Sequence, residues 1–164
     1  TQIIDSGKYY RIYKENNNQV RYEIYNPEGK IALSEKTDRP IEINTIGGDI
    51  IDIGIGMGTG ITIHKYYNAN ENTFSEEFTN VLTNSDKIIA YIEVSKENPL
   101  ENRKVVVQNI FDKSLFYKEF KLNFSNVDTP VIEAEFSKDG ASLLLTYLSG
   151  EKQTQTSEIL DLTV

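Results

Sequence analysis

Hydrophobic and polar residues alternate along most of this chain, and a turn-forming Asn, Asp, Gly or Pro follows about every 8 to 12 residues. In a β-strand successive side chains point to opposite faces, so this period of two predicts strands rather than helices. We expect strands over residues 8–14, 19–26, 30–37, 40–46, 49–56, 60–68, 73–80, 87–95, 103–111, 115–122, 130–137, 142–149 and 154–163.

Two of these segments also fit a helix. Thr73-Phe-Ser-Glu76 has the spacing of a helix capping box, and residues 114–122 can be drawn as a short helix. We favour strands, because Phe74, Glu76 and Phe78 alternate in the same register as the residues at 116, 118 and 120.

The sequence repeats itself. Residues 22–36, 63–78 and 107–120 each run from an apolar and aromatic strand, through an Asn or Asp, into a second strand. The turn residues of the three segments are Asn26, Asn68 and Asp112, so the repeat is about 42 residues long. A repeat of this length built from strands is typical of propeller blades or stacked β units.

The predicted fold is therefore all-β, made of antiparallel four-stranded repeats in a propeller-like arrangement that is either a small closed ring or an open, partial one. A β-sandwich is the alternative. We treat residues 1–164 as one domain of four units, residues 1–37, 38–78, 79–122 and 130–164. The first and last units each lack one strand, and residues 1–5 could complete one of them.

One stretch is close to a known repeat. Val131-Ile-Glu-Ala-Glu-Phe-Ser-Lys-Asp-Gly140, followed by apolar residues 143–147, resembles the inner hairpin of a β-propeller blade. Overall the chain is similar to uncharacterised extracytoplasmic domains of bacterial surface lipoproteins. This resemblance implies a propeller-like fold and a location outside the cytoplasm, and it implies no particular activity.

Composition narrows the possible partners. The net charge is −8, and the few arginines (Arg11, Arg21, Arg39 and Arg103) are scattered, which argues against nucleic acid as a partner. There is no cysteine, which excludes disulfides and thiolate ligands, and no apolar run is long enough to span a membrane. Because the chain begins at Thr1 without a leader, we expect a processed protein with a signal segment or lipid anchor upstream.

A glycine-rich segment gives the candidate ligand site. Residues 54–60 lie between two predicted strands, so no helix N-terminus is present to bind phosphate. We expect the isoleucines of residues 51–55 to fill one sheet face, and the glycines to leave the other nearly bare. The candidate ligand-binding residues on or beside that bare face are Asp52, Gly54, Gly56, His64 and Tyr66.

No motif points to catalysis. His64 is the only histidine, without ligand-type neighbours at metal-binding spacing, and there is no Gly-x-Ser-x-Gly motif. Carboxylate pairs such as Glu133 and Glu135 fit a solvated strand face as well as an acid–base pair. We predict no catalytic residue, no metal and no cofactor.

The resulting hypothesis is a non-enzymatic, extracytoplasmic binding or protein-interaction module of a bacterial surface protein, whose partner is a protein or glycan. One alternative is a carbohydrate-active or ester hydrolase that uses carboxylates in a channel. Two partly buried carboxyl groups in a cleft would favour it. The other is a spacer domain without a small-molecule pocket. An exposed apolar patch at an open sheet edge would instead mark a partner-binding surface.

Overall fold

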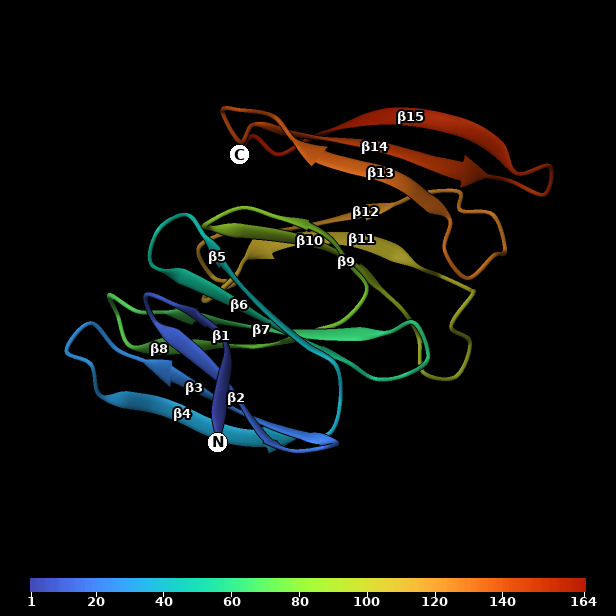
Figure 1. Cartoon of the computed structure of the whole chain (residues 1–164). Coiled ribbons are helices and arrows are strands. Elements are labelled where there is room, and N and C mark those ends of the chain that lie inside the picture. The colour runs from blue at the N-terminus through green and yellow to red at the C-terminus, as the bar shows by residue number, and fades with distance from the viewer. The chain divides into compact units, whose positions relative to one another are not determined.

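The structure is a computed structural model that describes residues 1–164, and it contains fifteen strands and no helix (Figure 1). The strands are β1 (Gln2–Gly7), β2 (Tyr10–Asn16), β3 (Gln19–Tyr25), β4 (Ile31–Thr37), β5 (Ile41–Ile46), β6 (Ile50–Gly56), β7 (Thr62–Asn68), β8 (Thr73–Phe78), β9 (Val81–Asn84), β10 (Ile88–Glu93), β11 (Lys104–Asn109), β12 (Tyr117–Lys121), β13 (Val131–Phe136), β14 (Ser142–Ser149) and β15 (Thr154–Asp161). No helix long and apolar enough to cross a membrane is present.

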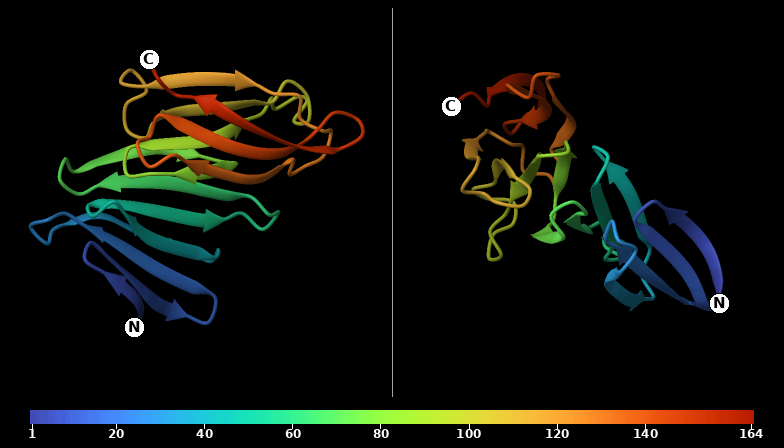
Figure 2. Two further views of the ribbon diagram at one scale, coloured as in Figure 1. Left: turned by 90° about the horizontal axis from the view of Figure 1, so that it is seen from above. Right: turned by 90° about the vertical axis from the view of Figure 1, so that its left-hand side faces the viewer.

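The strands form four antiparallel sheets, and each sheet consists of strands that follow one another in the chain. The strand orders are β1-β2-β3-β4, β5-β6-β7-β8, β12-β11-β10-β9 and β13-β14-β15. Figure 2 shows consecutive strands side by side within each sheet, and none of the sheets closes on itself. The predicted all-β fold of repeated antiparallel sheets is confirmed, and three of the four sheets have four strands.

The two segments that also fitted a helix are strands. Residues 73–78 form β8, which pairs with β7, and residues 117–121 form β12, which pairs with β11. The N-terminal residues form β1, which pairs with β2 and gives the first sheet its fourth strand. The last sheet has three strands.

The sequence repeat has a structural cause at the turn between the third and fourth strands of a sheet. The side-chain oxygens of Asn26, Asn68 and Asn109 each accept hydrogen bonds from two backbone amides that follow within four residues. Such Asx turns reverse the chain at the end of a strand. The sequence comparison placed Asp112 at the third position, but Asn109 occupies it; Asp112 accepts from Ser114 inside the same turn.

The chain divides into two compact units, residues Thr1–Thr79 and Asn80–Val164, and the division falls between the second and third predicted repeats. Each unit contains two sheets and a hydrophobic core to which both sheets contribute. The core of the first unit includes Tyr10, Ile12, Tyr22 and Ile24 from one sheet and Ile43, Ile51, Ile53 and Tyr67 from the other. The core of the second unit includes Ala90, Val105 and Val107 from one sheet and Leu143, Leu145, Tyr147 and Leu160 from the other.

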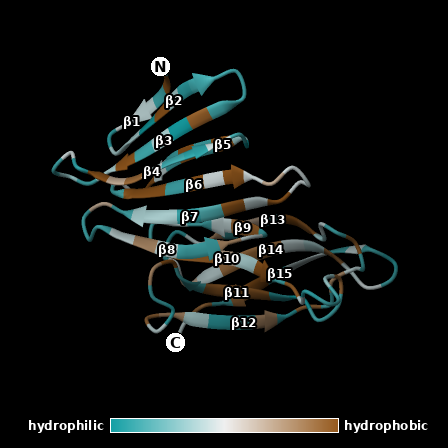
Figure 3. Cartoon of the chain, turned by 90° about the horizontal axis from the view of Figure 1, so that it is seen from below, coloured by the Kyte–Doolittle hydropathy of each residue, from teal (hydrophilic) through white to brown (hydrophobic).

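Alternation along a strand decides which side chains enter these cores. Hydrophobic segments lie along β6 and β11 in Figure 3, whereas many of the connections between strands are polar. In β14, Leu143 and Leu145 are fully buried, and Leu144 between them is 38% exposed because it points to the opposite face.

Leu145→Ala should lower the free energy of unfolding by about 2–5 kcal/mol, because it removes a fully buried side chain and leaves a cavity. The matched control Leu144→Ala, one residue away on the outer face, should cost about 1 kcal/mol or less. Urea denaturation followed by far-UV circular dichroism measures both, and equal losses would show that the alternation does not set the core.

Candidate functional site

The five residues singled out in the sequence lie on one face of neighbouring strands. In the register of β6 and β7, Asp52 is opposite Tyr66 and Gly54 is opposite His64. Gly56 is opposite Thr62, two residues further along β6 and on the same face. The antiparallel pairing therefore brings residues from two predicted strands into one cluster, as the alternation requires.

The side chains of this cluster contact one another. Nδ1 of His64 lies 2.8 Å from Oδ1 of Asp52, which makes a hydrogen bond, and the rings of His64 and Tyr66 stack with centroids 6.3 Å apart. A Cβ atom added to Gly54 would lie 3.5 Å from Cε1 of His64 and 3.4 Å from Cγ2 of Thr62. Side chains of β7 thus cover Gly54, and Pro40 covers Gly56, so the glycine face is not bare.

Accessibility limits what this cluster can contact. Tyr66 is fully buried and Asp52 is 7% exposed, whereas the side chain of His64 is 24% exposed. Neither of the two cavities described below is lined by any of the five residues. The assignment of a ligand to these five residues stays a prediction.

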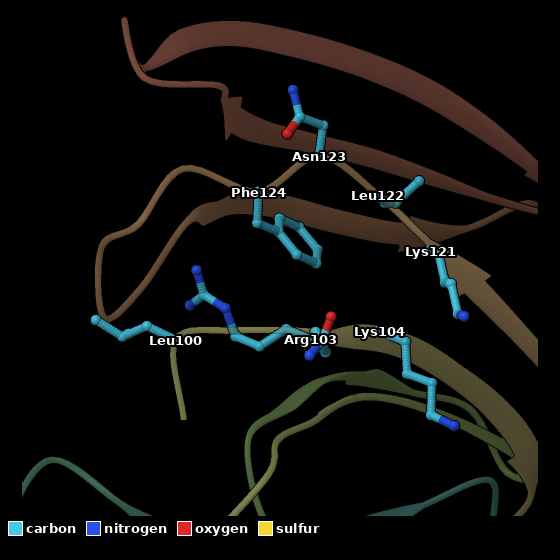
Figure 4. A pocket seen from close by; sticks show the side chains of 8 residues that line it. Leu100, Arg103, Lys104, Lys121, Leu122, Asn123 and Phe124 are labelled. Atoms are coloured by element: carbon cyan, nitrogen blue, oxygen red, sulfur yellow. The ribbon is translucent and has the colours of Figure 1, made fainter. Parts of the chain in front are cut away.

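A cavity lies within the second unit, at a place that the sequence did not indicate. Its volume is about 490 Å³ (Figure 4). The start of β11, the end of β12, the loop before β11 and the segment after β12 form its walls. The lining residues are Leu100, Asn102, Arg103, Lys104, Lys121, Leu122, Asn123 and Phe124, which we call the basic pocket.

Arg103 fixes one wall of the basic pocket. Arg103 is only 6% exposed. Its guanidinium donates hydrogen bonds to the backbone carbonyls of Val127, at 2.7 Å, and Ser125, at 2.6 Å. The guanidinium also lies 5.6 Å from the centre of the Phe124 ring, beside which it is drawn in Figure 4. Arg103 therefore ties the segment after β12 to the start of β11.

The same segment is held from its other side by β14. The Ser125 amide donates to the carbonyl of Leu148 and the Ser125 hydroxyl donates to the carbonyl of Gly150. The Phe124 ring packs edge-on against Tyr147, with centroids 5.2 Å apart. Both sheets of the unit thus position this wall.

The two lysines of the pocket differ in their partners. They are opposite each other across β11 and β12, and in Figure 4 their side chains extend the same way. The ammonium of Lys104 lies 2.9 Å from Glu93 and 2.8 Å from Glu119, whereas Lys121 forms no ion pair. The hydrogen bond from Lys104, followed in importance by that from Tyr117, lowers the pKa of Glu119. The hydrogen bond to Glu119, together with burial, raises the pKa of Tyr117 to about 12.

The basic pocket carries no local sequence signature, since its residues come from two segments about 20 positions apart. The available signal was the hairpin itself. Once the turn near Asp112 is recognised, antiparallel pairing places the residue at 104 opposite the residue at 121, with a like charge on both.

An exposed apolar patch at an open sheet edge, which we expected to mark a partner-binding surface, is present in the second unit. Ile132, Leu144 and Ile159 are exposed on the outer face of the three-stranded sheet, and Ile159 is 73% exposed on its edge strand. Leu144 and Ile159 also line a small cavity of about 280 Å³. Exposed apolar side chains beside an open strand edge are typical of surfaces that contact other proteins.

Arg103→Lys should lower the free energy of unfolding by about 1–3 kcal/mol, because one ammonium cannot replace a guanidinium that bonds both the buried carbonyl of Ser125 and the half-buried carbonyl of Val127. The matched control Arg39→Lys changes an exposed arginine with one bond to the carbonyl of Met57 and should cost about 0.5 kcal/mol or less. Chemical denaturation, with hydrogen exchange of residues 123–127, checks this clamp. Unchanged exchange in that segment would contradict it.

No protein-family model matches this sequence, and no curated protein is significantly similar to it. The resemblance to domains of bacterial surface lipoproteins accordingly gains no support from these comparisons.

Proposed function

We propose that this chain is a non-enzymatic binding module and that the basic pocket is its ligand site. The observation that carries the proposal is a cavity of about 490 Å³ whose wall is held by Arg103 and Ser125. Small-molecule sites are commonly preformed concavities of roughly 300–1,000 Å³. They combine apolar walls with a few fixed polar groups, and Leu100, Phe124 and Asn102 supply both kinds here.

The chemistry of the lining supports binding rather than hydrolysis. Glycoside hydrolysis uses two carboxyl groups on opposite sides of the scissile bond. The eight residues around the basic pocket include three basic side chains and two amides, and no Asp or Glu. A ligand in this pocket would meet groups that hold and orient it.

The alternative, a hydrolase, is favoured by one contact in the first unit. The 2.8 Å hydrogen bond between Asp52 and His64 is the geometry by which a carboxylate orients a histidine base. Under our proposal the purified protein leaves a panel of glycans and esters intact. Hydrolysis that disappears in His64→Ala would decide for the enzyme instead.

The proposal includes a location and a kind of partner. We place the module outside the cytoplasm, as part of a bacterial surface protein that meets a protein or a glycan. The support is the blade-like hairpin at residues 131–147 and the acidic charge of the chain. Resistance of the native protein to protease added outside intact cells would argue against this location.

Small ligands should perturb the basic pocket and no other region of the second unit. In a nuclear magnetic resonance screen of neutral and acidic monosaccharides, we expect amide shifts to cluster in residues 100–104 and 121–124. Leu100→Trp should weaken the binding of any hit by about tenfold or more, because the larger ring occupies the cavity.

Leu115→Trp is the matched control, since Leu115 is a 72% exposed leucine of the same unit outside the pocket. The natural chain contains no tryptophan, so each variant also carries one fluorescent reporter. A ligand that binds Leu100→Trp and the unaltered protein equally well would place its site elsewhere.

A further inference from the structure

We propose that the ligand of the basic pocket is a small organic anion, such as a sugar acid, with Lys121 as the group that pairs with its carboxylate and Arg103 as a buried positive charge behind it. This inference rests on the proposed function, because it assigns a ligand class to the same pocket.

The charge of the pocket is opposite to that of the chain. The chain has 25 acidic and 17 basic residues, yet the lining has three basic residues and no acidic one. Among the three basic residues of the lining, Lys104 forms ion pairs with Glu93 and Glu119, which neutralise its charge. The positive charges left for a ligand are those of Arg103 and Lys121.

Arg103 is a buried cation without a carboxylate partner. Its two hydrogen-bonded acceptors are neutral backbone carbonyls, and its buried Nε has no hydrogen-bond partner. Burial lowers the pKa of Arg103, while the charge of Asp128 acts in the opposite direction. Because a guanidinium stays protonated in proteins, its charge remains in a poorly solvated place, and an anion in the adjoining cavity would stabilise it.

Lys121 supplies the accessible charge. It is exposed, it makes no ion pair, and it is directly opposite Lys104 across two paired strands. Like charges at opposite positions of a sheet repel each other. Glu119, two residues away, is hydrogen-bonded to Lys104 and Tyr117, and it attracts Lys121 without forming an ion pair with it. An incoming carboxylate can therefore pair directly with the Lys121 ammonium.

The size of the pocket, and the three apolar side chains in its mainly polar lining, indicate an organic anion rather than an inorganic one. Sulfate or phosphate alone would leave most of the 490 Å³ empty. Leu100, Leu122 and Phe124 offer apolar contacts to a carbon skeleton, and Asn102 and Asn123 offer amide groups to its hydroxyls. A sugar ring with one carboxylate satisfies both kinds of wall.

Isothermal titration calorimetry with glucuronate, galacturonate, inorganic sulfate and glucose tests this. We expect one of the two sugar acids to bind, and glucose and sulfate to bind at least about tenfold more weakly. Binding of the sugar acid should weaken between about 50 mM and about 500 mM sodium chloride, since the pair at Lys121 is screened. Lys121→Glu should abolish binding and Lys121→Arg should retain it.

Lys152→Glu is the control, because Lys152 is an exposed lysine in the β14–β15 turn of the same unit and it should leave the affinity unchanged. Glucose that binds as tightly as the sugar acids, in a manner sensitive to Leu100→Trp, overturns the anion assignment and leaves the pocket as a ligand site. Sulfate binding as tightly as the sugar acids overturns the organic part. Binding of no compound, or binding unaffected by both Leu100→Trp and Lys121→Glu, overturns the pocket itself.

Discussion

A short antiparallel meander with one apolar face cannot shield that face from water by itself, and the whole chain is arranged around this constraint. Core residues recur at alternate positions, such as Ile51 and Ile53 in β6 or Val105 and Val107 in β11, and each of the two units covers one sheet with another. Burial of such side chains stabilises the fold by about 1.5–3 kcal/mol each. Repetition of the strand–turn unit supplies the second sheet that covers the first.

Packing sheet against sheet also creates the basic pocket. After β12 the chain must pass to the other sheet of the second unit, and an irregular connection carries backbone groups that need partners. Arg103 and Ser125 provide these partners, from the start of β11 and from the connection itself. The cavity lies where this connection spans the two sheets, so the features that hold the fold together there are the features that shape the site.

Two of the buried polar clusters, one around Asp52 and one around Arg103, leave their charged groups with different partners. Asp52 and His64 satisfy each other within the first unit, and the neighbouring Tyr66 ring packs against the imidazole. Arg103 is buried as deeply as Asp52 but is bound only to neutral carbonyls. A paired group has little need of a ligand, whereas an unpaired cation beside an open cavity does, and this difference is why we place binding in the second unit.

Alternation along the chain and the Asx turns at Asn26 and Asn68 were sufficient to predict strands and their consecutive pairing, because these are local properties of the chain. The expected alternation of Phe74, Glu76 and Phe78 on one face was wrong, because a bulge in the β7–β8 pairing puts Phe74 beside Tyr67 and Phe78 beside Tyr66, on the opposite face. Alternation also placed Asp52, His64 and Tyr66 on one face, because the register of two strands joined by a short turn can be derived from the number of residues between them. The role of Asn109 in place of Asp112, the burial of Tyr66 and the meeting of Arg103 with residues 123–127 were decided by tertiary structure. Contacts between segments that do not pair as neighbours depend on how sheets pack, and no period in the sequence encodes that packing.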